Sequence, residues 1–152
     1  MENTCISLIE RVHSSFLEYP LIYGHGTDNA WDEAVCLVTG SAGLEDDQES
    51  LLLPISNAKV DKVLLLAKSR VEDRIPLPYL MGFCSYAGYR FNIEPGVVIP
   101  RSPIGHLLVD GDLAAWHQQE VVRVLDLCSG SGCLGILAAL TYPGAEVVLL
   151  EK

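Results

Sequence analysis

The residues best suited to chemistry lie in a run of small side chains between an apolar stretch and a helical pattern. Val121 to Leu127 is rich in β-branched residues and has the length of a strand. Gly130 and Gly132 follow it, and glycines allow positive φ and a close approach of the backbone to a ligand. The apolar spacing after them predicts a helix, whose free N–H groups favour a polar or anionic group. Strand, tight turn and helix in this order predict a nucleotide-binding loop.

A second carboxylate is positioned by the segment that follows. Pro143-Gly144 ends the predicted helix, and Glu146 to Leu150 is typical of a buried strand. Glu151 comes directly after this strand, where a carboxylate can accept two hydrogen bonds from a ribose diol. We therefore expect the opening of a nucleotide-binding α/β domain, cut off after its second strand.

Two cofactors fit the spacing of this loop. Gly130, Gly132 and Gly135 satisfy G-x-G-x-x-G, and Glu151 stands at about the 20-residue separation of dinucleotide sites. Asp126 favours the other cofactor, because Asp-x-small-x-Gly-x-Gly resembles motif I of the S-adenosylmethionine methyltransferases. Its charge suits a cationic cofactor better than a pyrophosphate. A dinucleotide-dependent oxidoreductase and a turn that binds nothing remain alternatives.

Composition limits the class of protein. The chain has 152 residues, of which 49% are hydrophobic, and a net charge of −10, which predicts a soluble globular protein. No apolar run approaches the roughly 18 residues that span a bilayer, and the N-terminus lacks the pattern of a secretory signal. The sequence has only 10 Lys and Arg residues, which disfavours nucleic-acid binding. The acidic surface suits a basic protein partner instead.

Cysteine and histidine usage indicates the compartment and argues against a metal. Five cysteines, an odd number without paired spacing, predict free thiols in a reducing cytoplasm. Cys128 and Cys133 fall in the loop region, where packing is the preferred interpretation of a small side chain. The four histidines are scattered along the chain, so no metal site is expected.

The first 73 residues predict three amphipathic helices. The first has Asn3 or Thr4 as its cap and Pro20 as its stop. The second follows a cap at Thr27-Asp28 and ends near Gly40, and the third runs from about Ser56 to Asp73. Together they predict a small helical domain at 1–73.

The middle of the chain predicts a bridge to the α/β domain. A β-hairpin is expected over Phe83 to Ile99, with turns at Gly88 and Pro95-Gly96. A further helix is expected over Pro103 to Trp116. The predicted division is therefore a helical domain at 1–73, a linker and hairpin at 74–100, and the first portion of an α/β domain at 101–152.

On these residues the chain resembles the HemK-like protein-(glutamine) methyltransferases, which methylate a glutamine side-chain amide with S-adenosylmethionine. Tyr23 to Ala34 is similar to the helical-domain signature of the branch that acts on ribosomal protein L-three. Arg74 to Leu80, Pro100 to Gly105 and Cys128, in place of the usual first glycine of motif I, resemble the same branch. The release-factor branch more usually has Pro-Arg-Pro-Glu-Thr after the hairpin and is the nearest alternative.

The resemblance implies a fold and roles for individual residues. A helical substrate-recognition domain and a hairpin would precede a class I, Rossmann-like methyltransferase domain. S-adenosylmethionine would be held by the loop and the second strand tip, at Cys128, Ser129, Gly130, Ser131, Gly132 and Glu151. Asp126 would support the loop and face the methionyl amine. Arg101 and Pro103 would lie near the active-site mouth, and an ion pair that holds the hairpin is an equal alternative for Arg101.

One motif that the resemblance implies does not occur in these 152 residues. Asn-Pro-Pro-Tyr, which grips the substrate amide in the family, is absent from the sequence. Methyl transfer to an amide nitrogen depends on placing that nitrogen in line with the sulfonium methyl. We therefore expect the N-terminal half of an enzyme, without catalytic residues and inactive alone, whose open sheet edges favour self-association. A noncatalytic binding module is a further alternative.

Overall fold

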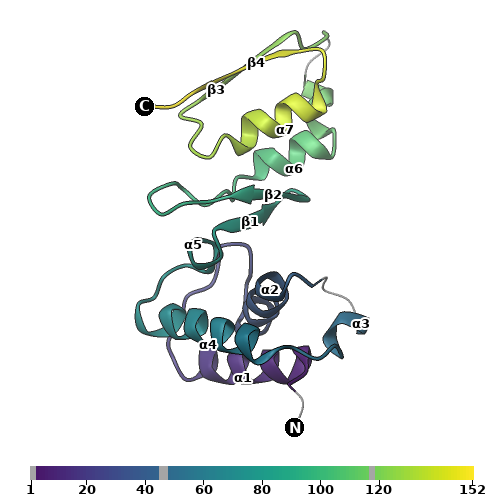
Figure 1. Ribbon diagram of the computed structural model, residues 1–152. Coiled ribbons are helices and arrows are strands. Elements are labelled where there is room, and N and C mark those ends of the chain that lie inside the picture. Colours follow the sequence, from purple (N-terminus) through teal and green to yellow (C-terminus); the bar gives the residue numbers. More distant parts are fainter. Residues whose placement is uncertain (1–2, 45–47, 117–118) are drawn as a thin grey trace. The chain divides into compact units, whose positions relative to one another are not determined.

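The computed structural model describes residues 3–44, 48–116 and 119–152 (Figure 1). Contacts divide the chain into two compact units, Met1–Gly82 and Phe83–Lys152. The division predicted from the sequence has boundaries after residues 73 and 100, whereas the contacts place one boundary after Gly82. Residues 74–82 therefore group with the helical unit.

The first unit consists of helices around one apolar core. They are α1 (Cys5–Leu17), α2 (Ala30–Ala42), α3 (Gln48–Leu51), α4 (Asn57–Glu72) and α5 (Leu77–Met81). The helices α1, α2 and α4 pack against one another and correspond to the three predicted amphipathic helices, which are confirmed. The core side chains that are least exposed come from these three helices and include Leu8, Ile9, Val12, Phe16, Leu37, Val38 and Val63.

Local capping sets the starts of α1 and α2. Thr4 accepts a hydrogen bond from the Ser7 amide at 3.3 Å, and the Ser7 hydroxyl accepts one from the Thr4 amide at 3.1 Å, which forms a capping box. Asn29 caps α2 by accepting from the Asp32 amide at 2.9 Å. The predicted cap at Thr27-Asp28 is therefore wrong, because Asn29 is the residue with extended backbone directly before the helix.

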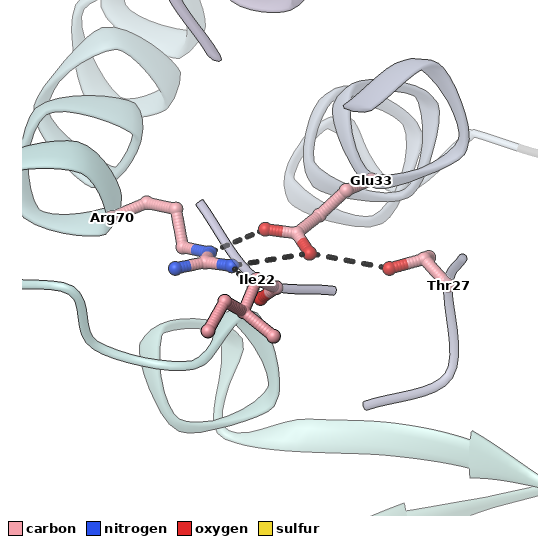
Figure 2. Close-up of polar contacts among 4 residues, drawn as sticks. All are labelled: Ile22, Thr27, Glu33 and Arg70. Carbon is pink, nitrogen blue, oxygen red and sulfur yellow. Dashed lines mark hydrogen bonds and ion pairs between the residues drawn. The ribbon is translucent and has the colours of Figure 1, made fainter. Parts of the chain in front are cut away.

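A buried ion pair joins α2, α4 and the segment before α2 (Figure 2). Arg70 and Glu33 are only 4% and 2% exposed, and the Arg70 Nε donates to Glu33 Oε1. Arg70 Nη2 donates to the Ile22 carbonyl at 3.0 Å, and the Thr27 hydroxyl donates to Glu33 Oε2 at 3.2 Å. The Tyr23 ring centre lies 5.9 Å from the guanidinium carbon. One pair of charges thus fixes both the helices and residues 22–27.

We predict that Arg70→Met lowers the free energy of unfolding by about 3–5 kcal/mol, because it leaves the Glu33 carboxylate buried without its partner. The double variant Arg70→Met/Glu33→Leu should lose much less. The exposed pair Lys68–Glu72, at 3.8 Å, provides the control, since Lys68→Met should cost less than about 1 kcal/mol. Urea denaturation measures all three. Equal losses for Arg70→Met and Lys68→Met would contradict the prediction.

The second unit combines two small sheets with helices. Its elements are β1 (Phe83–Tyr86), β2 (Tyr89–Asn92), α6 (Pro103–Val109), the 3-10 helix η1 (Asp112–Trp116), β3 (Arg123–Leu127), α7 (Cys133–Thr141) and β4 (Glu146–Leu150). The strands β1 and β2 pair antiparallel, and β3 and β4 pair parallel. Helices with an antiparallel and a parallel pair agree with the predicted mixture of an α+β part and the start of an α/β domain.

Three predicted elements of this unit are shorter than expected. The strand predicted over Val121 to Leu127 begins at Arg123. The hairpin turns at Ala87-Gly88, both with positive φ, and its second strand ends at Asn92, so Pro95-Gly96 lies in the loop beyond it. The helix predicted over Pro103 to Trp116 is interrupted at Gly111, whose φ of +79° is not helical. The predicted strand from Glu146 to Leu150 is confirmed with the same ends.

Neither a membrane-spanning helix nor a group of metal ligands occurs in the described part of the chain. Within residues 3–44, 48–116 and 119–152, no helix has the length and apolarity needed to cross a membrane. Over the same described residues, no three His, Cys, Asp or Glu side chains are grouped so that they could hold a metal ion.

Candidate functional site

Parallel pairing brings the loop after β3 and the residue after β4 to the same sheet edge. Leu127 lies opposite Leu150, so the next residues, Cys128 and Glu151, leave the sheet at the same level. The Gly130 amide donates to Glu151 Oε2 at 2.6 Å, and the Ser129 amide donates to the Leu150 carbonyl at 3.2 Å. The structure therefore brings the predicted loop and the predicted second acid together.

Three left-handed residues shape the loop. Gly130 and Gly132, predicted to form the turn, have φ of +55° and +73°, and Cys128 has φ of +59°. The left-handed conformation costs a residue with a Cβ roughly 1–2 kcal/mol, so Cys128 is strained. The only signal for this in the sequence is the resemblance, which places Cys128 where the family usually has glycine.

Close packing of α7 on β4 explains the glycines at 132 and 135. A Cβ added to Gly132 would lie 2.8 Å from Leu149 Cδ2, and one added to Gly135 would lie 2.8 Å from Leu149 Cγ. Both separations are too short for carbon atoms. Gly135, which completes the G-x-G-x-x-G spacing, therefore lets helix and strand approach each other.

Asp126 acts on the start of α7. Its Oδ2 accepts a hydrogen bond from the Gly135 amide, in the first turn of the helix, at 2.8 Å. A carboxylate there is favoured by the helix dipole. Asp126 lines a second, apolar groove together with Trp116, Leu125 and Leu134. The loop residues 128–132 do not line this groove. The structure thus gives Asp126 a supporting position, and its approach to a methionyl amine stays a prediction.

A groove of about 720 Å³ opens beside the loop. This volume lies in the range of about 300–1,000 Å³ typical of small-molecule sites. Six of the predicted residues line it, namely Arg101, Cys128, Ser129, Gly130, Ser131 and Glu151. The other three, Asp126, Gly132 and Pro103, do not line it.

Apart from Arg101, the facing wall of the groove was not predicted from the sequence. Residues 96–102 form it, and Val97 Cγ1 lies 3.9 Å from the place where a Cβ on Gly130 would stand. The sequence pattern assigned Pro95 to Ile99 to the hairpin. These residues instead run past the loop, a long-range contact that no local pattern contains.

The groove presents both charges and the start of a helix. Arg101 and Lys152 provide cations and Glu151 a carboxylate. In the part of the chain that the structure describes, Arg101 makes no ion pair, so the alternative role of holding the hairpin by an ion pair is not observed. Gly132 offers α7 no side-chain cap, and the first helical residues, Cys133 and Leu134, line the groove.

The Glu151 carboxylate is anionic at neutral pH. Hydrogen bonds from the Gly130 and Lys152 amides, at 2.6 Å and 3.1 Å, lower its pKa from the usual value of 4.5. Such bonds stabilise the charged form. The groove therefore offers a charged acceptor for hydroxyl groups next to the glycine loop.

We predict that the Gly130 amide resonance moves as the pH falls, with a midpoint below 4.5, the ordinary pKa of the Glu151 carboxyl. The pKa is depressed in the folded chain, so this interaction is fully present above the ordinary Glu pKa and is lost as the pH falls through the folded value. An NMR titration of the amide measures the midpoint, and Glu151→Gln should abolish the transition. A midpoint at or above 4.5 would refute the bond between them.

Tyr86 fixes the wall that faces the loop. Its hydroxyl donates to the Ser102 carbonyl and accepts from the Gly105 amide at 2.9 Å. The Ser102 hydroxyl accepts from the Ile104 amide at 3.2 Å, so the two hydroxyls cap the start of α6. Burial raises the pKa of Tyr86, which keeps the phenol neutral and able to donate. Tyr86, which sequence reasoning missed, therefore holds the segment that carries Arg101.

We predict that Tyr86→Phe destabilises the second unit by about 1–3 kcal/mol, because it leaves the buried Gly105 amide without an acceptor. Exchange of the Gly105 amide hydrogen should accelerate. Thr141→Val is the matched control, since it removes a hydroxyl that bonds the Leu108 carbonyl at the other end of α6. Unchanged protection of Gly105 in Tyr86→Phe would show that the phenol does not hold this wall.

Three known proteins that are similar to this chain have the same name. The chain is 47% identical over 131 residues to a protein of Bordetella pertussis named ribosomal protein uL3 glutamine methyltransferase. This match covers 82% of the chain and 43% of the relative. Proteins with the same name from Burkholderia pseudomallei and Xanthomonas campestris pv. campestris are 42% and 41% identical. Each of these two matches covers 95% of the chain and 48% of the relative.

The predicted resemblance to the uL3 glutamine methyltransferases is confirmed. The chain spans a little under half the length of these curated relatives. No family model matches the chain. The names of the relatives agree with the ribosomal-protein branch that the sequence favoured over the release-factor branch.

Proposed function

We propose that this chain carries the cofactor-binding loop of a protein-glutamine methyltransferase that acts on ribosomal protein uL3. The observation that carries the proposal is the bond between Gly130 and Glu151, which joins a glycine loop to an acidic strand tip beside a groove of ligand size. The names of three relatives at 41–47% identity support the reaction and the substrate.

The residues of the groove fit S-adenosylmethionine. Glu151 would accept hydrogen bonds from the ribose hydroxyls, and the amides of Cys133 and Leu134, at the start of α7, would meet the polar groups of the ligand. Arg101 would pair with the carboxylate of the methionyl part. The bound cofactor would supply a methyl group on a sulfonium. The glycines keep the backbone of this chain close to the ligand, while Asp126 and Tyr86 hold the two walls in place.

The packing of the loop is common to the dinucleotide alternative. The third glycine of the G-x-G-x-x-G spacing, Gly135, packs against Leu149, as it would in either kind of site. Among the described residues, Arg101 and Lys152 are the cations that line the groove, and neither belongs to the glycine loop. A binding measurement that compares S-adenosylmethionine with NAD is therefore needed to assign the cofactor.

The substrate part of the proposal rests on charge. Ribosomal proteins bind RNA and are basic as a class, whereas this chain carries a net charge of −10. The larger share of the acidic excess lies in residues 1–82. We propose that this helical unit recognises the substrate protein. Free thiols at Cys84, Cys128 and Cys133 support a reducing, cytoplasmic setting.

We also propose that these 152 residues bind cofactor without methylating protein, because the sequence has no Asn-Pro-Pro-Tyr to grip the amide. The predicted self-association stays part of the proposal. Large apolar side chains exposed on η1, directly before β3 and on β3 support it, namely Trp116 at 82% and Val122, Leu125 and Leu127 at 63% each. Incubation of the chain and uL3 with labelled S-adenosylmethionine should give no enzyme-like transfer.

Calorimetry tests the cofactor. We predict that the chain binds S-adenosylmethionine in preference to NAD, and that Glu151→Gln weakens binding by about tenfold to a hundredfold, the effect of hydrogen bonds to a charged group. Glu146→Gln is the control, because Glu146 is the first residue of β4, the strand that Glu151 follows, and pairs with Arg123 at 3.0 Å. Tighter binding of NAD than of S-adenosylmethionine would overturn the proposal.

A further inference from the structure

The helical unit contains a second pocket of ligand size. It has a volume of about 310 Å³ and lies within residues 1–82. Pro20, Ile22 and His25 line it from the segment before α2, Arg70 from α4, and Arg74 and Pro76 from the segment after α4. Neither the proposed reaction nor the cofactor groove uses these residues.

One nitrogen of the buried Arg70 is open to this pocket. Nε and Nη2 of Arg70 donate hydrogen bonds to the Glu33 carboxylate, and Nη2 also donates to the Ile22 carbonyl, as Figure 2 shows. Nη1 makes no hydrogen bond to any residue that the structure describes. Every buried side-chain nitrogen or oxygen in that part of the chain has a partner, so Nη1 must be accessible. Arg70 is 4% exposed and lines the pocket, which therefore receives two N–H donors from a rigidly held guanidinium.

Arg74 gives the pocket its net positive charge. Its φ of +57° is left-handed, which turns the chain directly after α4. Its side chain is exposed, lines the pocket and has no ion-pair partner among the residues described. Glu33 neutralises Arg70, so Arg74 leaves one uncompensated positive charge. A monoanion matches that charge better than a dianion does.

Apart from His25, the remaining residues that line the pocket are apolar, and a hydrogen bond from the core holds the backbone of one of them, Ile22. The Ile22 side chain is 81% exposed, although its carbonyl is fixed by Arg70 Nη2 at 3.0 Å. Pro20 and Pro76 add further apolar surface. A rigid backbone therefore holds a large aliphatic side chain in solvent beside two guanidinium groups. Such a surface suits a ligand with an aliphatic part next to its anionic group.

We propose that this pocket binds a carboxylate attached to an aliphatic group, as a peptide presents it. The carboxylate would accept hydrogen bonds from Arg70 Nη1 and pair with Arg74, and the aliphatic part would pack on Ile22 and the prolines. The source is either the terminal carboxylate of a polypeptide or an acidic side chain beside an aliphatic residue.

NMR titration of the full chain tests the proposal with four probes. N-acetyl-leucine represents a chain terminus, and N-acetyl-leucyl-glutamyl amide represents an acidic side chain. Either should shift the amide resonances of Ile22, His25 and Arg74 in a saturable way, and the tighter of the two identifies the source. N-acetyl-leucinamide, which has no charge, should bind about tenfold more weakly than the tighter carboxylate probe, and inorganic phosphate should be no better than this amide.

Two variants separate the contributions of charge and apolar surface. Arg74→Gln should weaken the tighter carboxylate probe about tenfold, whereas Arg11→Gln, an exposed arginine on α1 that does not line the pocket, should leave its affinity unchanged. Ile22→Ser keeps the carbonyl that Arg70 binds and should weaken both carboxylate probes. The proposal is overturned if no probe saturates, if phosphate or the uncharged amide binds as well as the carboxylates, or if Arg74→Gln binds like the unaltered chain.

Discussion

The parallel register of β3 and β4 is the constraint on which the candidate site depends. Leu127 and Leu150 are partners, so the loop and the acid that follow them emerge together, 21 residues apart in the sequence but joined by the bond from Gly130 to Glu151. A slip of one residue would turn every side chain of one strand to the opposite face of the sheet and separate these two groups. The approach of α7, made possible by Gly132 and Gly135 against Leu149, supports this register from the adjoining helix.

The sequence predicted the parts of the site that local chemistry specifies. Pro143-Gly144 delimits the strand from Glu146 to Leu150, whose ends agree with the structure. The turn glycines 130 and 132 are left-handed as expected. Apart from Arg101, which the resemblance placed near the active-site mouth, the wall at residues 96–102 was not predicted, because it meets the loop only through the tertiary fold.

Other differences have equally local reasons. Gly111 divides a segment whose apolar spacing alone favours one helix, because a left-handed residue ends the helical hydrogen bonding. Asn29 replaces the predicted cap because it stands directly before α2 with extended backbone. The sequence predicted that Asp126 supports the loop and faces the methionyl amine. In the structure its carboxylate accepts a hydrogen bond from the Gly135 amide and so points toward the start of α7. The spacing of residues in the sequence could not predict the direction of this side chain.

Tyr86 and Gly105 constrain each other. The phenol oxygen caps α6 at the place where any Cβ on residue 105 would have to stand, and an added Cβ would overlap the Tyr86 ring as well as its hydroxyl. A chain that replaced Gly105 would therefore need a smaller residue at position 86, and with it another acceptor for the start of the helix. Residue 105 can therefore gain a side chain only if residue 86 changes with it, although 19 residues of chain separate the two.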